Sequence, residues 1–174
     1  VKSQVARKAL ESGADIINDI SAMVDDGMAE VAAESAAPLI LMHRRGTPAT
    51  MQSNTDYVDL IGEVYSFLKK RIDRARQAGV AQWGIDPGLG FSKTVGGNFL
   101  LLKHMRHFAN LGCPLLVGAS RKSFIWKTLG ETADEALEGS LALAVLSRAA
   151  GAHIIRVHDV QASCRALRVA DAVL

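Results

Sequence analysis

Five polar or charged side chains stand at the ends of apolar segments and together could form one ligand site. They comprise an amide, a carboxylate, an ammonium, a guanidinium and an imidazole, from Asn18, Asp86, Lys122, Arg156 and His158. Asp86 can accept two parallel N–H donors from an amino-pyrimidinone edge, and Asn18 offers a heterocycle both a donor and an acceptor. Lys122, Arg156 and His158 offer a point charge, a planar fork and a further donor to phosphate oxygens. The set predicts a site for a flat polar ring joined to an anionic group.

These side chains are positioned by a regular alternation of helical and apolar segments. Helices are expected over residues 2–12, 25–35, 55–79, 98–110, 133–150 and 159–173, with Thr55 and Asp159 as N-caps. Strands are expected over residues 14–20, 38–43, 80–86, 114–119 and 152–157. Glycines 13, 79, 112 and 151 stand where four helices should end. The alternation predicts an α/β fold of parallel βαβ units, whose strands converge with their carboxyl ends on one site.

Two readings of this pattern stay open at this point. Each polar residue taken alone could be a cap or a loop residue, whereas five of them at the same end of successive strands favour a shared site. The sheet could be an open doubly wound sheet or part of a (β/α)₈ barrel. A whole barrel needs about 250 residues, more than the 174 of this chain.

The loop PGLGFSKTVGG, residues 87–97, superficially resembles a phosphate-binding P-loop. That motif requires glycine directly before Lys-Thr, whereas Ser92 precedes Lys93 here, so the nucleotide interpretation is weak. Gly88 and Gly90 are expected to let the backbone approach a ligand closely. Phe91 could cover that ligand or simply pack. His43, at the end of a predicted strand, could be a buried, hydrogen-bonded residue that supports the site.

Composition narrows the class of protein. A net charge of +2 and 5% aromatic residues argue against binding to nucleic acid or to a membrane surface. The two cysteines, Cys113 and Cys164, have no CxxC spacing, which argues against a disulfide scaffold or a cysteine zinc site and fits the reducing cytoplasm. No apolar run reaches the length of a membrane span.

Five sequence blocks at the ends of the predicted strands resemble the dihydropteroate synthase family of pterin-binding enzymes. In chain order they are ADIINDIS, LILMHRRGTP, GIDPGLGFSKT, LLVGASRKSF and IIRVHDV. The resemblance implies a (β/α)₈ barrel, usually dimeric, of which this chain would supply about strands four to eight. The chain would then be a partial pterin-binding domain over residues 1–174, and the N-terminal strands would be missing.

The resemblance also implies a reaction. The family condenses 4-aminobenzoate with (7,8-dihydropterin-6-yl)methyl diphosphate, giving 7,8-dihydropteroate and diphosphate in folate biosynthesis. Magnesium assists the diphosphate, and its ligand is expected from the missing N-terminal segment. Sulfonamides, which resemble aminobenzoate, inhibit the family. The expected partners are therefore these two substrates and a second copy of the full-length protein, with no nucleic acid and no membrane.

Site residues follow from the motifs that match. Asn18, Asp86 and Lys122 would bind the pterin, and Ile20 and Met42 would line its pocket. Arg156 and His158 would hold the diphosphate and, with Lys122, act in catalysis. The residues expected near aminobenzoate are Gly90, Phe91, Ser120 and Arg121.

Two alternatives remain beside this hypothesis. A pterin-binding methyltransferase shares the barrel and the pterin pocket but has no diphosphate for Arg156 and His158 to hold. A non-catalytic binding module or truncated paralogue would keep the fold without turnover, and the missing strands would leave open sheet edges.

Overall fold

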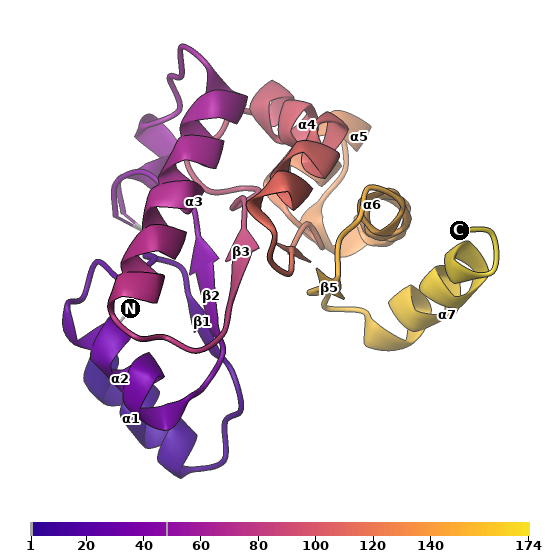
Figure 1. Ribbon diagram of the computed structural model, residues 1–174. Coiled ribbons are helices and arrows are strands. Elements are labelled where there is room, and N and C mark those ends of the chain that lie inside the picture. The colour runs from indigo at the N-terminus through magenta and orange to yellow at the C-terminus, as the bar shows by residue number, and fades with distance from the viewer. Residues whose placement is uncertain (1, 48) are drawn as a thin grey trace.

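The computed structural model describes residues 2–47 and 49–174 and contains parallel strands that alternate with helices (Figure 1). The strands are β1 (Ile17–Asp19), β2 (Leu39–Met42), β3 (Trp83–Asp86), β4 (Leu116–Val117) and β5 (Ile154–Ile155). The helices are α1 (Ser3–Glu11), α2 (Gly27–Ser35), α3 (Leu60–Gln77), α4 (Val95–Lys103), α5 (Ser123–Leu129), α6 (Leu137–Ala149) and α7 (Val160–Asp171). Short 3₁₀ helices cover Met51–Ser53, Met105–Leu111 and Ala133–Glu135. The predicted α/β class with parallel strands is confirmed.

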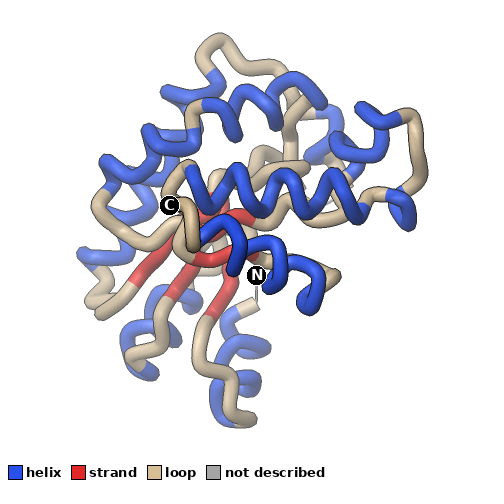
Figure 2. The backbone as a smooth tube through the Cα atoms, turned by 90° about the vertical axis from the view of Figure 1, so that its right-hand side faces the viewer, coloured by secondary structure: helices blue, strands red, loops and turns tan. Residues whose placement is uncertain are grey.

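The strands pair in sequence order, so their carboxyl ends lie at one edge. β1, β2 and β3 form one parallel sheet, in which Met42 pairs with Asp86, and β4 pairs with β5. A parallel bridge between Ile85 and Leu115 links the two groups, and the Ile85 amide donates to the Pro114 carbonyl at 2.9 Å. Figure 2 shows the strands side by side with helices packed around them. Residues that follow the strands are therefore collected at one edge.

Apolar residues on the strands and on the inner faces of the helices form the core. All four residues of β2 are buried, as expected for a parallel strand covered on both faces. Helix α3 packs against β2 and β3 through residues at helical spacing: Leu60, Val64, Leu68, Ile72 and Ala75. Within the described part of the chain, no helix is long and apolar enough to cross a membrane.

The structure corrects the expected helices at three places. Helix α3 begins at Leu60, because the Asp59 carboxylate, and not Thr55, caps it by accepting the Gly62 amide at 3.0 Å. Helix α4 begins at Val95 and gives way to a 3₁₀ helix at Met105, so the helix expected over 98–110 starts earlier and is broken. Helix α5 was not expected; it forms because Phe124 and Ile125 are buried in the core.

Candidate functional site

The end of β3 carries a buried carboxylate. The Asp86 residue is only 5% exposed, and its Oδ1 atom accepts the Gly88 amide at 2.7 Å. Burial raises the pKa of Asp86, against the opposing effect of the Lys122 cation and, to a smaller extent, of Lys93 and Arg156. A carboxylate in this position has a strong preference for a ligand that brings N–H donors to it.

Lys122 follows β4 and extends toward the loop after β3. Its ammonium donates to the Leu89 carbonyl and lies 4.5 Å from the centre of the Phe91 ring. Its stem crosses Gly90, where an added Cβ would lie 2.7 Å from Lys122 Cδ. Burial lowers the pKa of Lys122 to about 8, although Asp86 acts in the opposite direction. Asp86 and Lys122 are therefore a coupled anion and cation at neighbouring strand ends.

Two further predicted residues, Ser120 and His158, meet between the ends of β4 and β5. The buried Ser120 hydroxyl accepts the His158 amide at 3.2 Å and lies 3.0 Å from His158 Nδ1. Arg156 is exposed; its charge opposes the rise in the pKa of Asp86 that burial causes and adds to the lowering of the pKa of Lys122.

Arg121 is engaged within the protein. Its guanidinium donates to both carboxylate oxygens of Asp159, from Nε at 3.0 Å and from Nη2 at 2.7 Å. Its backbone has a φ of 55° and its amide donates to the Ser140 hydroxyl at 2.9 Å. Asp159 occupies the N-cap position of α7, as expected, but its side chain makes no cap hydrogen bond because the carboxylate binds Arg121 instead. The pair ties the loop after β4 to the start of α7.

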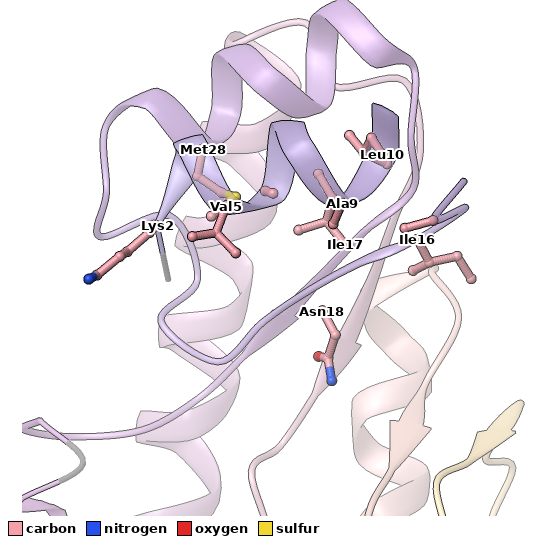
Figure 3. Close-up of a pocket in the computed structure, with 10 residues that line it drawn as sticks. Lys2, Val5, Ala9, Leu10, Ile16, Ile17, Asn18 and Met28 are labelled. Atoms are coloured by element: carbon pink, nitrogen blue, oxygen red, sulfur yellow. The ribbon is translucent and has the colours of Figure 1, made fainter. Parts of the chain in front are cut away.

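Asn18 belongs to β1 and Ile20 follows it, so β2 lies between them and Asp86 of β3. Asn18 is exposed between the buried residues Ile17 and Asp19, and among the described residues its amide has no hydrogen-bond partner. It borders a hollow of about 410 Å³ beside α1, and its amide points away from the apolar side chains of that hollow, such as Val5 (Figure 3). The Ile20 carbonyl accepts Arg44 Nε at 2.9 Å. No hydrogen bond among the described residues joins Asn18 or Ile20 to Asp86, and their part in the site stays a prediction.

The loop between β3 and α4, residues 87–94, contains contacts that the sequence did not indicate. The Lys93 ammonium is buried and donates to the carbonyls of Gly88 and Phe91 at 2.9 Å each. Gly88 has a φ of 73°, and an added Cβ would lie 1.9 Å from the His43 carbonyl oxygen. The Gly90 amide donates to the Asn98 side chain at 2.6 Å. Both glycines thus pack closely against protein atoms, while their approach to a ligand stays a prediction.

The magnesium ion that the family resemblance implies would need side chains that can bind a metal. In residues 2–47 and 49–174, no group of three or more His, Cys, Asp or Glu side chains could hold a metal ion. Cys113 and Cys164 are both free thiols.

Comparison with known proteins shows which family the chain matches. The model of the family described as pterin binding enzyme matches residues 1–158. The chain is 48% identical, over 99% of its length, to the dihydropteroate synthase of a Synechocystis strain, and 45% identical, over 99% of its length, to that of Escherichia coli. It covers 61% and 62% of those proteins, so it spans about three fifths of the curated relatives it matches.

Solved structures give the same result. A dihydropteroate synthase from Thermus thermophilus in complex with 6HMPPP superimposes with a TM-score of 0.94 at 38% identity, covering 98% of this chain and 68% of that one. The Thermus enzyme in complex with 4-aminobenzoate gives 0.96 at 37% identity, over 99% of this chain and 68% of that one. The Yersinia pestis enzyme with a sulfonamide drug complex gives 0.95 at 37% identity, over 98% and 63%.

Proposed function

The chain belongs to the family of pterin binding enzymes, and from this premise we propose that it is part of a dihydropteroate synthase. The reaction would join (7,8-dihydropterin-6-yl)methyl diphosphate to 4-aminobenzoate, giving 7,8-dihydropteroate and diphosphate. The observation that supports this most strongly is the buried Asp86 carboxylate at the end of β3, followed by a loop whose Leu89 carbonyl accepts the Lys122 ammonium. The relatives' names and the ligands in the solved structures point in the same direction.

The pterin ring would lie over the ends of β2 and β3. Its amino-pyrimidinone edge presents parallel N–H donors, which the buried Asp86 carboxylate would accept. Lys122 would donate to an acceptor of the ring, since its ammonium has three donors and the Leu89 carbonyl uses one. Met42, paired with Asp86 in the sheet, would line the pocket together with Ile20, and Asn18 would offer its amide.

Arg156 and His158 would hold the diphosphate and stabilise its departure. When the bond between the methylene carbon and the bridging oxygen breaks, negative charge grows on that oxygen. A fixed guanidinium and an imidazole placed at this oxygen favour the transition state more than the ground state. The electron-rich pterin ring spreads the positive charge left on the methylene carbon. The amine of aminobenzoate then forms the C–N bond and loses a proton, so the protein needs no nucleophile.

Gly90, Phe91, Ser120 and Arg121 would border the aminobenzoate. Phe91 is half-buried and faces the Lys122 ammonium, which supports a place for its ring beside the proposed pterin position. A sulfonamide would compete for the same place. Arg121 would support this site indirectly, because its guanidinium is bound to Asp159 and holds the loop after β4 in place.

The finer features of the fold are proposals of the same kind. The five strands would correspond to about strands four to eight of an eight-stranded barrel, with residues 1–174 as a partial pterin-binding domain. The first three strands would then come from elsewhere and would supply the magnesium ligand. The complete protein would be a homodimer of the cytoplasm. The greater length of the matched relatives supports a larger complete fold.

Product formation by the full-length protein that contains this chain tests the proposal. We expect diphosphate release to require both 4-aminobenzoate and the dihydropterin diphosphate and to be blocked by a sulfonamide. Arg156→Ala should lower this activity strongly, since the diphosphate leaving group loses the guanidinium that would bind it. An Arg156→Ala protein with full activity on a pterin substrate would favour a methyltransferase, and a wild-type protein without turnover would favour a non-catalytic paralogue.

A further inference from the structure

One buried cation has no part in the function proposed above. Lys93, at the end of the β3–α4 loop (residues 87–94), is only 5% exposed. None of the ion pairs among the described residues includes it, so no carboxylate neutralises it directly. Burying an unpaired ammonium is unfavourable unless each of its N–H groups finds an acceptor. The position therefore needs an explanation in the contacts it makes.

The contacts of the Lys93 ammonium join two strand ends. Two acceptors belong to its own loop, the carbonyls of Gly88 and Phe91, at 2.9 Å each. The third is the Nδ1 atom of His43, directly after β2, at 2.9 Å, and the His43 carbonyl lies at 3.4 Å. Three donors thus meet three close acceptors. Removal of the ammonium would leave His43 Nδ1 without this donor, while the Gly88 carbonyl would keep only the Phe91 amide at 3.1 Å and the Phe91 carbonyl only the Ser92 hydroxyl at 2.7 Å.

The hydrogen bonds of the Lys93 ammonium to the loop and to His43 are called the Lys93 anchor. His43 is itself held firmly in place. Its residue is 3% exposed, and its ring packs edge-on against Phe67 of α3, with centroids 4.9 Å apart. Burial, together with the Lys93 and Arg45 cations, lowers the pKa of His43 far below its ordinary value, so the ring is neutral. Because Nδ1 accepts from Lys93, the ring proton stands on Nε2. Burial also lowers the pKa of Lys93 to about 7, against the effect of Asp86.

The backbone of the β3–α4 loop depends on the Lys93 anchor more than the backbone of β3 does. Asp86 lies within β3, where pairing with Met42 holds its backbone, and the Gly88 amide holds its carboxylate. Gly90 and Phe91 lie beyond the strand. The Phe91 carbonyl accepts from Lys93 and from the Ser92 hydroxyl, and the Phe91 amide donates to the Gly88 carbonyl, which Lys93 also binds. The Gly90 amide donates to Asn98, and its carbonyl accepts from Gln52 at 3.2 Å. Loss of Lys93 should therefore displace Phe91 more than Asp86.

We propose that Lys93 is a positioning residue, whose ammonium fixes the β3–α4 loop against His43 so that Gly90 and Phe91 present one shape to 4-aminobenzoate. The inference rests on the proposed function, because it names the substrate that this loop would meet. It assigns Lys93 an effect on one substrate and not on the other. A residue needed only for stability would change the amount of folded enzyme and leave both KM values unaltered.

The test uses the full-length protein that contains this chain, with Lys93→Met and, as a matched control, Lys103→Met at an exposed position of α4. We expect Lys93→Met to raise KM for 4-aminobenzoate about tenfold, the effect of losing one hydrogen bond from a charged donor. KM for the dihydropterin diphosphate should change by less than about threefold. Lys103→Met should match the wild type in both values.

Lys93→Gln covers the case in which Lys93→Met fails to fold, since its amide can still donate to the loop carbonyls. An intermediate rise in KM for 4-aminobenzoate alone would support the proposal. Equal changes in both KM values, unaltered KM values with lower kcat, or loss of folded protein in both variants would overturn it. A wild-type protein that releases no diphosphate would instead overturn the proposed function, and this inference with it.

Discussion

The Nζ atom of Lys122 lies 4.5 Å from the centre of the Phe91 ring, so a cation that follows β4 covers an aromatic ring in the β3–α4 loop. The same ammonium donates to the Leu89 carbonyl of that loop. Cation–π attraction contributes about 0.5–2 kcal/mol, depending on how far the cation is removed from water. This contact joins the two strand ends on which the proposed pterin site depends. A substitution of Lys122 should therefore change the position of Phe91, and a substitution of Phe91 should change the position of Lys122.

Asp86→Asn should separate stability from activity. The asparagine Oδ1 can still accept the Gly88 amide, but the variant removes a buried charge and offers the pterin edge one acceptor in place of two. Because burial raises the pKa of Asp86, the folded state favours the protonated form, and stability falls as the pH rises above the ordinary value of 3.8. We expect unfolding in urea at pH 7 to show equal or greater stability in the variant, with turnover lower by about a hundredfold.

A variant that loses stability but keeps its turnover would contradict this account of Asp86. The pH series supplies a control, since the difference in stability between Asp86→Asn and the wild type should shrink as the pH falls toward the ordinary pKa of 3.8.

The pH dependence of turnover should report Lys122. Burial holds its pKa at about 8, so its ammonium loses the proton as the pH rises through that value, and wild-type activity should decline there. Lys122→Met should have low activity without this decline, while Lys70→Met, at an exposed position of α3, should keep it. Activity profiles from pH 6 to 10 of the three proteins would measure the difference, and a decline near pH 8 that survives in Lys122→Met would assign it to another group.

As the pH rises above 8, the free energy of unfolding should increase while the activity declines. A lysine whose pKa in the folded protein lies below the ordinary 10.5 makes folding less favourable at low pH, so stability rises between pH 8 and 10.5. We expect this rise, measured by urea unfolding, to be smaller in Lys122→Met than in the wild type. Equal slopes in the two proteins would show that the Lys122 environment is not as described.

Gly88→Ala should destabilise the β3–α4 loop. The added Cβ would lie 1.9 Å from the His43 carbonyl oxygen, at a φ of 73° that non-glycine residues rarely adopt. We expect a loss of about 1–3 kcal/mol in the free energy of unfolding. Gly96→Ala is the matched control, because nothing lies within 4 Å of its Cβ position, in helix α4, where alanine is favoured. A Gly88→Ala protein as stable as Gly96→Ala would contradict the close approach of the loop to β2.

Asp159→Asn should loosen the junction between β4 and α7. Hydrogen bonds from Arg121 hold the pKa of Asp159 below its ordinary value, so the contribution of the pair is present above pH 3.8 and is lost as the pH falls further. We expect kcat/KM to fall several-fold, because Ser120 and His158 lie on the two segments that the pair joins. Asp171→Asn, which removes the exposed pair with Arg148, serves as control and should leave kcat/KM unchanged.

The order of strands and helices was predictable because each strand lies in a short, largely apolar run and four of the expected helices end at a glycine. Glycines 13, 79, 112 and 151 all have positive φ, as the sequence indicated. Helix α5 was missed because it is short and follows the charged run of Arg121 and Lys122, and the burial of Phe124 and Ile125 that helps to stabilise it is a tertiary effect. The start of α3 was misplaced because Thr55 and Asp59 are both plausible caps, and tertiary contacts decide between them.

The site was predictable in part. The charges of Asp86 and Lys122 act on each other's pKa, whereas the roles of all eleven proposed site residues in binding stay predictions. The anchoring role of Lys93 could not be read from the sequence, because a lysine next to a polar loop is usually exposed, and its burial depends on His43, fifty residues away. The side chain of Asp159 was assigned to its own helix for the same reason: its partner, Arg121, is distant in sequence.

The most direct measurement is a crystal structure of the full-length protein with bound (7,8-dihydropterin-6-yl)methyl diphosphate. We predict that the Asp86 carboxylate accepts hydrogen bonds from the amino-pyrimidinone edge, that Lys122 donates to the ring, and that Arg156 contacts the diphosphate. A pterin bound elsewhere, with Asp86 and Lys122 free of it, would contradict the account.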